Sequence, residues 1–403
     1  MLRVSVDKIE PGMVLARPIP MPHDPRHFLL QRGVEIPPDV IPRLKQLNIF
    51  EVWIRHRDLE FLEDVIDEGL DQQQREIYQL VRRNFESIMQ GAAVDLEVQH
   101  FERSISGLFN VLKNSNTGNV LLQKLDAFDN YLMSHSTNVC YLSLLLGMKI
   151  DRYLIEERQF KSAKDAKDLQ NLGLGCILHD VGKMHIPAEI LNKPGKLTFD
   201  EMEVMKQHPT FGFDMVKGRV PANAAQVVLN HHQRYCGGGY PSRIDSRTQK
   251  ELSPLAGRQI PIFSRIATVC DIYDAATTNR VYQAGKPPVQ VLHEMRMLCK
   301  EFFDPQIANA FYQIIPPFPI GQVVKLSNEV EAVVVDFNPR RPVRPKVQGL
   351  KDPYGARYRD PSLEEIDLAQ YEDLQITAIG SVDVRPYQAT QEPARSPAVF
   401  AFA

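Results

Sequence analysis

Histidine and aspartate residues recur between positions 135 and 271 in a pattern that suits metal-dependent chemistry. His179 and Asp180 are adjacent, His231 and His232 form a second pair, and His208 lies between the two pairs. Divalent iron, manganese, zinc and similar ions accept imidazole and carboxylate ligands together. A site with enough such ligands for two ions can clamp both oxygens of a displacement at phosphorus. The pattern therefore predicts a metal-dependent phosphohydrolase.

The predicted ligand set spans several segments of the chain. Asp180 directly follows a histidine at the predicted end of a helix, so its carboxylate is well placed to bridge two ions, with a hydroxide between them as the nucleophile. The side chains of an adjacent pair such as His231 and His232 diverge by about 100° on a helix and so face different surroundings. A lone histidine inside an apolar helix, such as His135, is more commonly a core residue. The full set is His135, His179, Asp180, His208, His231, His232 and Asp271.

Lys183 and the glycine-rich run that follows the second histidine pair suit the binding of a phosphate or a nucleobase. Lys183 lies three residues beyond Asp180 and can reach an anionic phosphate oxygen as a point charge. The run Gly237-Gly238-Gly239-Tyr240-Pro241 allows close approach of the backbone to a ligand, and Tyr240 can offer its ring to a base or its hydroxyl to a phosphate. A simple surface turn is the alternative for this run.

Two further residues lie on, or just after, the last predicted helix of the site. Asp271 and Asp274 are three residues apart and share a helix face, so Asp274 can orient a ligand or contact a guanine edge. Arg280 suits bidentate contact with phosphate or guanine, and a surface salt bridge is its alternative role.

The overall composition excludes several classes of protein. The 403 residues are 43% hydrophobic and 24% charged with a net charge of -3, which gives no general attraction to nucleic acid polymers or anionic membranes. No apolar run reaches the roughly 20 residues that a membrane span needs, and the first residues lack the apolar stretch of a signal peptide. The five cysteines show no Cys-x-x-Cys spacing, which argues against a disulfide framework. These features predict a cytoplasmic protein.

Hydrophobic periodicity predicts a mainly α chain with a small α/β unit at its start and a small β unit near its end. Residues 1–58 read as the α/β accessory domain, and residues 59–113 as an amphipathic helical linker. That linker either pairs with a second copy, giving a homodimer, or packs on the next domain. Residues 114–316 are predicted to form the catalytic domain, residues 317–384 a β appendage, and residues 385–403 a disordered tail.

Two local signals add predictions about structure. Thr198 and Glu201 have the spacing of a capping box, so a helix should begin there. Arg340, Arg341, Arg344 and Lys346 form a short basic run between prolines, which reads as a solvated loop.

The segment from His135 to Pro305, a little under half of the chain, resembles the HD-GYP family, a branch of the HD-domain phosphohydrolases. The N-terminal unit is similar, more weakly, to the small domain that often precedes this one. The motifs that carry the resemblance are His135-Ser136, Leu178-His179-Asp180-Val181-Gly182-Lys183, Ile186-Pro187, Lys193-Pro194-Gly195-Lys196-Leu197-Thr198, His208-Pro209, His231-His232, Gly239-Tyr240-Pro241, Asp271-Ile272-Tyr273-Asp274-Ala275, Arg280, Tyr282 and Phe303-Asp304-Pro305.

This resemblance implies a helical bundle of the HD-domain type that hydrolyses cyclic di-GMP to pGpG and/or GMP with two or three bound metal ions. We expect iron or manganese, among the divalent ions that accept histidine and aspartate ligands. By motif position, the seven ligands are those named above, and Asp180 and Lys183 are the catalytic residues. Lys183, Tyr240, Asp274 and Arg280 are implied to contact the dinucleotide.

The sequence departs from the family pattern at several positions. Gln233 and Cys236 stand where the family usually has Glu and Asp, and Gln283 stands where Lys is frequent. Members with three metals carry an acidic residue at the position of Tyr131, so we expect two metal ions here. The departures leave two alternatives open: a cyclic di-GMP receptor or scaffold with weak or no turnover, and a hydrolase of another cyclic dinucleotide.

Overall fold

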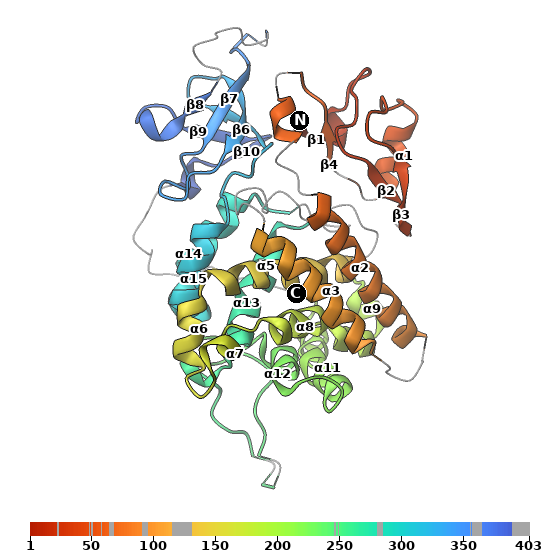
Figure 1. The fold of residues 1–403 in the computed structure, drawn as a ribbon, viewed down its shortest axis with the longest axis vertical. Helices are drawn as coiled ribbons and strands as arrows, with labels where there is room; N and C mark the ends of the chain where they lie inside the picture. Colours follow the sequence, from red (N-terminus) through yellow and green to blue (C-terminus); the bar gives the residue numbers. More distant parts are fainter. Residues whose placement is uncertain are drawn as a thin grey trace.

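The computed structural model is mainly helical, which confirms the predicted fold class, and small strand-rich units lie beside each other above the helical body (Figure 1). It describes residues 1–21, 24–47, 49, 51–57, 59–63, 68–90, 96–114, 131–245, 247–248, 250–279, 285–354, 356 and 365–388. None of the described helices is both long and apolar enough to cross a membrane.

The N-terminal unit is built from paired strands and one short helix around a small apolar core. The apolar run from Met13 to Leu15 suggests a second strand in the sequence, but in the structure it forms isolated bridges from Val14 to Glu35 and from Leu15 to Ile54 instead. Its elements are β1 (Leu2–Ser5) paired with β4 (Glu51–Ile54), β2 (Ile19–Met21) paired with β3 (Asp24–Leu30), α1 (Val40–Gln46), and the 3-10 turns η1 (Val6–Lys8) and η2 (Glu60–Glu63).

The helical body surrounds two helices that are buried along almost their whole length, α5 and α8. The apolar spacing of the sequence predicts one helix from about Val120 to Met148. The structure describes this helix from Tyr131 onward, and residues 115–130 lie outside the described part of the chain. The elements are α2 (Glu68–Met89), α3 (Val98–Asn114), α5 (Tyr131–Lys149), α6 (Asp151–Glu157), α7 (Ala163–Ala166), α8 (Gln170–Leu178), η3 (Val181–His185), α9 (Ala188–Leu191), α10 (Phe199–Met205), α11 (His208–Val216), α12 (Ala222–Asn230), η4 (Gly257–Gln259), α13 (Ile262–Thr277), α14 (Pro288–Phe302) and α15 (Pro305–Ile314).

The amphipathic helices of residues 59–113 turn their apolar faces inward. Ile77 and Phe85 on α2, and Phe101 and Ile105 on α3, have no exposed surface, and they belong to the same hydrophobic cluster as α5 and α8. Packing on the next domain was one of the two arrangements that the sequence left open. Since this face is already covered, self-association of these helices would have to use their outer faces.

Capping places α10 where the sequence predicted a helix to begin. The Thr198 hydroxyl accepts a hydrogen bond from the Glu201 amide, and the Glu201 carboxylate accepts one from the Thr198 amide. This reciprocal pair satisfies two amides that the first helical turn would otherwise leave without partners. The helix leads directly into His208 at the start of α11.

The C-terminal unit is one antiparallel sheet of six strands in the order β10-β9-β5-β6-β7-β8. The sequence pattern predicts three of these strands, at residues 323–326, 331–335 and 376–379, and does not reveal the others. The strands are β5 (Val323–Leu326), β6 (Glu331–Asp336), β7 (Lys346–Lys351), β8 (Ile366–Asp367), β9 (Ile376–Ile379) and β10 (Val382–Asp383), with the 3-10 turns η6 (Leu368–Gln370) and η7 (Arg385–Tyr387). The turn η7 falls inside the predicted disordered tail, whose residues from 389 onward lie outside the described part.

The basic run of this unit is used within the fold. Arg341 donates to the carbonyl of Ala369 at 2.6 Å, and Arg344 donates to the carbonyl of Leu374 at 2.5 Å. Lys346 already belongs to β7. The predicted solvated loop is therefore confirmed only in part: Arg340 and Arg341 are exposed in a loop, but Arg341 and Arg344 also hold the 369–374 segment against the sheet.

The two strand-rich units also share a hydrophobic core. Arg3 in β1 forms a parallel bridge with Gln322 beside β5, and its amide donates to the Gly321 carbonyl at 3.1 Å. Beneath this junction lies one cluster with members from both units: Met1, Ala16, Leu59 and Leu62 from the first, and Ile320, Val333, Val335 and Leu350 from the second.

Candidate metal centre

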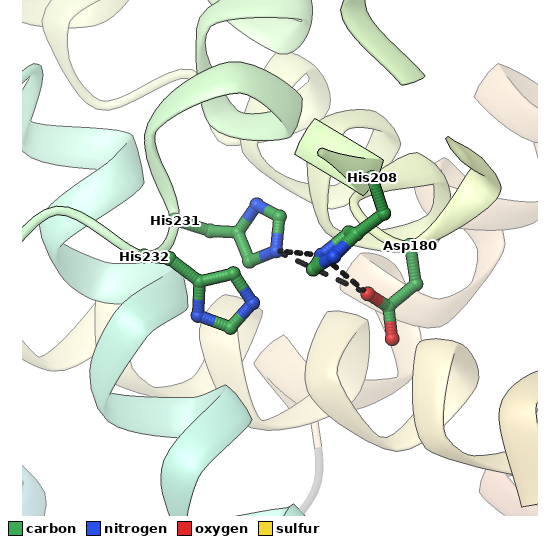
Figure 2. Close-up of side chains that lie close together, drawn as sticks. All are labelled: Asp180, His208, His231 and His232. Carbon is green, nitrogen blue, oxygen red and sulfur yellow. Dashed lines mark hydrogen bonds and ion pairs between the residues drawn. The ribbon is translucent and has the colours of Figure 1, made fainter. Parts of the chain in front are cut away.

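The structure brings all seven predicted ligands into one buried centre, although they come from five segments of the helical body. His135 lies on α5, His179 and Asp180 follow α8, His208 begins α11, His231 and His232 follow α12, and Asp271 lies on α13. All of them are buried except His232, whose side chain keeps 23% of its surface exposed. Figure 2 shows four of them, Asp180, His208, His231 and His232, with their side chains directed at one another.

Asp180 lies at the middle of the centre, and its two oxygens face different histidines. Oδ1 is 3.3 Å from Nε2 of His208 and 4.0 Å from Nε2 of His231. Oδ2 is 3.3 Å from Nε2 of His179 and 3.8 Å from Nε2 of His135. A carboxylate placed in this way can join two ligand groups, as a bridging ligand does.

The donor atoms form overlapping groups within 4.8 Å of one another. One group is Asp180, His208, His231 and His232, a second is His135, His179 and Asp180, and a third is His179, His231 and Asp271. The first two groups share Asp180. This sharing gives two adjacent places at which imidazole and carboxylate ligands converge.

Hydrogen bonds fix the orientation of the imidazole rings. His179 Nδ1 donates to the Cys176 carbonyl at 2.7 Å, His208 Nδ1 to the Met205 carbonyl at 2.8 Å, and His231 Nδ1 to the Val228 carbonyl at 2.9 Å. These bonds place the proton on Nδ1 and leave Nε2 as the lone-pair donor, which is how proteins commonly orient metal-binding histidines. The acceptors lie three residues before each histidine, so the helix ends themselves supply them.

His135 is oriented by a carboxylate instead. Its Nδ1 donates to Asp274 Oδ2 at 2.8 Å, and its Nε2 lies 3.0 Å from Asp271 Oδ1. Burial alone would lower the pKa of His135, but the two aspartates raise it to about 9. A metal ion at Nε2 would therefore have to displace a proton that is tightly held in the metal-free protein.

The remaining electrostatics favour neutral imidazoles facing ionised carboxylates. Burial lowers the pKa of His232 to about 3 and also lowers the pKa of His208 and of His231. Burial would raise the pKa of Asp180, but His179 and Lys183 beside it hold that pKa well below its usual range. Metal binding needs these same protonation states.

The donor set fits divalent cations for a further, geometric reason. Nε2 of His208 and Nε2 of His231 are only 3.3 Å apart, although both rings carry their proton on Nδ1. Two lone pairs facing each other in a buried site repel unless a cation lies between or beside them. His179 Nε2 and Asp180 Oδ1 are likewise buried without a hydrogen-bond partner. Orphaned polar atoms of this kind call for a bound ion, because burial without a partner is costly.

Lys183, the predicted phosphate-binding residue, lies at the edge of the centre. Its Nζ donates to Asp180 Oδ2 at 2.8 Å, and its side chain is 19% exposed. Its turn η3 packs tightly on α11: Gly182 lies so close to the His208 carbonyl that an added Cβ would overlap it. Lys183 is therefore held next to the Asp180 carboxylate, and its side chain remains partly exposed.

Tyr240 covers the exposed side of the histidine pair. Its ring stacks on His232 with centroids 4.5 Å apart and an interplanar angle of 27°, and it meets His208 edge-on at 6.3 Å. Burial raises the pKa of the Tyr240 phenol well above its ordinary value, so the hydroxyl remains a donor at neutral pH.

The structure does not show the other residues predicted to contact the dinucleotide in a position to do so. Asp274 has no exposed surface, and its carboxylate holds the His135 ring, so its contact with substrate stays a prediction. Arg280, Tyr282 and Gln283 lie outside the described residues. Cys236 is exposed, whereas Gln233 is buried and donates to the Pro241 carbonyl.

Two side-chain interactions of the helical body were not assigned from the sequence. Tyr131 stacks on His135 with centroids 5.3 Å apart and an interplanar angle of 12°. Arg265 on α13 forms a buried brace: it pairs with Glu157 and, at 2.5 Å, with Asp304, which also accepts from the Tyr153 hydroxyl at 2.8 Å. In the sequence, Phe303-Asp304-Pro305 is a motif of the family resemblance, and its partners Arg265 and Tyr153 lie far away along the chain.

Comparisons with known proteins agree with this geometry. Residues 151–307 match the model of the HD domain, and residues 323–383 match that of a KOW domain associated with HD domain. The chain is 32% identical over 247 residues to "Cyclic di-GMP phosphodiesterase PA4108" of Pseudomonas aeruginosa, covering 61% of this chain and 53% of that protein. It is 38% identical over 140 residues to a "Cyclic di-GMP phosphodiesterase" of Thermotoga maritima, covering 34% of this chain and 35% of that protein.

A third relative has a different named substrate. The chain is 34% identical over 135 residues to "3'3'-cGAMP-specific phosphodiesterase 2" of Vibrio cholerae, covering 33% of this chain and 24% of that protein. The matched regions thus span about half or less of the length of these relatives.

The helical fold, the buried His-Asp centre and these matches define an HD-domain protein, a class whose His and Asp residues bind divalent metal. Within that class, the chain resembles the HD-GYP family, and its relatives include proteins named as cyclic di-GMP phosphodiesterases.

Proposed function

We propose that this protein is a metal-dependent phosphodiesterase that hydrolyses cyclic di-GMP to pGpG and/or GMP. The observation that carries the proposal is the shared carboxylate of Asp180, which faces two groups of imidazole donors in one buried centre. Two relatives named as cyclic di-GMP phosphodiesterases support the choice of substrate.

We further propose that the centre holds two divalent ions, iron or manganese. His208, His231 and His232 would hold one ion and His135, His179 and Asp271 the other, with Asp180 between them. Bound there, divalent ions supply Lewis acidity toward a phosphate oxygen and lower the pKa of a coordinated water.

The residues around the ions would bind and orient the substrate. Lys183 is positioned to leave its contact with Asp180 and pair with the phosphate under attack, because its side chain already reaches the edge of the centre. Tyr240 would meet the dinucleotide with its ring or its hydroxyl, since it covers the exposed side of the centre. Arg280 and Asp274 complete the proposed contacts.

The decisive test is anaerobic incubation of manganese- or iron-loaded protein with cyclic di-GMP, followed by chromatography of the products. We expect pGpG or GMP from the wild type. Asp180→Ala should lose metal and product together, because it removes the ligand that both groups share. Lys183→Ala should keep its metal and turn over more slowly. Full activity in Asp180→Ala would refute the bridging role.

Substrate comparison separates the proposal from its alternatives. Parallel reactions with cyclic di-GMP and 3'3'-cGAMP would identify a hydrolase of the second nucleotide, to which one relative's name points. Binding of cyclic di-GMP to metal-loaded protein without product would identify a receptor or scaffold instead.

The site of action and the assembly state complete the proposal. Because cyclic di-GMP is a bacterial intracellular messenger, we place the reaction in the cytoplasm, and cell fractionation tests this. A homodimer would use the outer faces of α2 and α3, because their apolar faces are buried. Light scattering after gel filtration would measure the mass directly, and a monomer would rule the dimer out.

A further inference from the structure

Gln233 lies directly after the histidine pair and is 3% exposed. We propose that Gln233 is a positioning residue whose side-chain amide fixes the loop that carries Tyr240, and thereby fixes how Tyr240 lies on the metal ligands. The inference deepens the proposed function and relies on it for the expected effect on substrate.

The hydrogen bonding of Gln233 shows which of its groups matters. Nε2 donates to the carbonyl of Pro241 at 2.8 Å, whereas Oε1 is buried without a hydrogen-bond partner. The side chain therefore acts as a donor, toward an acceptor eight residues ahead in the chain. A carboxylate has no proton to donate when ionised. Glu at this position would place a buried negative oxygen against the Pro241 carbonyl oxygen, which is unfavourable.

Other hydrogen bonds fix the outer part of the loop, so Gln233 fixes only the part that returns toward the metal ligands. Its outer part is fixed to the end of α14, where the Tyr235 amide donates to the Phe302 carbonyl at 3.0 Å and the Cys236 amide to the Glu301 carbonyl at 3.1 Å. The chain then turns back through glycines with positive φ at positions 237 and 238. At Gly239 a Cβ would overlap the backbone of residues 232–234, so the returning part of the loop lies directly on the segment that carries Gln233.

Two hydrogen bonds hold this returning part of the loop beside the metal ligands. The Tyr240 amide donates to the His232 carbonyl at 3.2 Å. One residue later, the carbonyl of Pro241 accepts the hydrogen bond from the Gln233 side chain. Between these two anchors lies the Tyr240 ring, which stacks on His232 at 4.5 Å. Loss of the Gln233 anchor should let this ring move away from His232, while His232 itself keeps its place at the end of α12.

The test compares two substitutions of Gln233 with a matched control. Gln233→Met keeps the length of the side chain but removes the donor, and Gln233→Glu replaces the donor with a carboxylate. Gln306→Met makes the same chemical change at an exposed position on α15. The readouts are bound metal by mass spectrometry, amide hydrogen exchange of residues 237–241, binding of a phosphorothioate analogue of cyclic di-GMP, and kcat and KM.

We expect both Gln233 variants to keep their metal and their melting temperature within a few degrees of the wild type. Amide exchange in residues 237–241 should be faster. Analogue binding should weaken and KM should rise roughly three- to tenfold, the cost of one neutral hydrogen bond, with a smaller change in kcat. Gln306→Met should match the wild type in every readout.

Three outcomes would overturn the inference. The first is wild-type exchange and affinity in Gln233→Glu, which would show that no donor is needed. The second is loss of metal or of the folded state in both variants, which would make Gln233 a general structural residue. The third is unchanged exchange in Gln233→Met. If the wild type neither binds nor hydrolyses cyclic di-GMP, the proposed function fails, but the exchange measurement still decides the role of Gln233.

Discussion

Asp274→Asn tests whether Asp274 acts on the metal centre through His135. The carboxylate accepts the Nδ1 proton of His135 at 2.8 Å, in a place with no solvent exposure. Removing such an outer partner typically weakens metal binding 10- to 100-fold, or about 1.4 to 2.8 kcal/mol. Asn retains an oxygen acceptor but not the charge, so we expect a loss near tenfold. Asp274→Ala removes the acceptor as well and should approach 100-fold.

The assay is competition for manganese between the protein and a chelator of known affinity, at fixed pH. Asp373→Asn is the matched control, because Asp373 is an exposed residue of the C-terminal unit, far in the sequence from the centre. Circular dichroism would confirm that each variant is folded before its affinity is measured.

One result would refute this reasoning directly. If Asp274→Asn binds manganese as tightly as the wild type but binds cyclic di-GMP more weakly, then Asp274 acts on the dinucleotide rather than on the His135 ring. The resemblance to the HD-GYP family implied that role, so the experiment decides between the two.

Three further predictions concern the stability of the centre. Gly182→Ala should cost about 1–3 kcal/mol of stability and reduce metal content, since its Cβ would push against the His208 carbonyl; a wild-type urea midpoint would contradict this. Arg265→Met should cost about 3–5 kcal/mol by leaving the Asp304 carboxylate buried without its cation, and an unchanged melting temperature would refute it. In the metal-free protein, the pKa of His135 is raised to about 9, so its protonated ring stabilises the fold fully below about pH 6.5 and progressively less toward pH 9. The melting temperature of that form should therefore fall between pH 6.5 and 8.5, and a flat or rising profile would show that the proton is not held as described.

Much of the centre could be predicted from residue types and local spacing. The histidine pair at 231 and 232 and the His179-Asp180 pair are recognisable in the sequence because each pair follows a helical stretch, and the structure brings these residues together. The capping box at Thr198 likewise predicted where α10 begins. These signals lie within a few residues of the feature that they predict, so they do not depend on how the chain folds over long distances.

The interactions that the sequence did not reveal join residues that are far apart. The i, i+3 spacing showed that Asp271 and Asp274 share a face of α13, but it could not show that the partner of Asp274 is His135, 139 residues earlier. The strands β7, β8 and β10 were missed because their short segments show little alternation of polar and apolar residues. Their pairing with neighbouring strands determines their structure instead.

The core shared by the two strand-rich units has a consequence for the order in which the protein folds. Leu59 and Leu62 belong to one buried cluster with Val333 and Val335, which are made more than 250 residues later (333 − 62 = 271). Contacts between such distant positions form slowly, because a long loop must close first. During synthesis, the N-terminal unit should therefore wait with part of its apolar surface uncovered while the helical body emerges and folds. The C-terminal unit would then cover the apolar surface of the N-terminal unit. A truncation that removes the C-terminal unit would therefore destabilise the N-terminal unit as well.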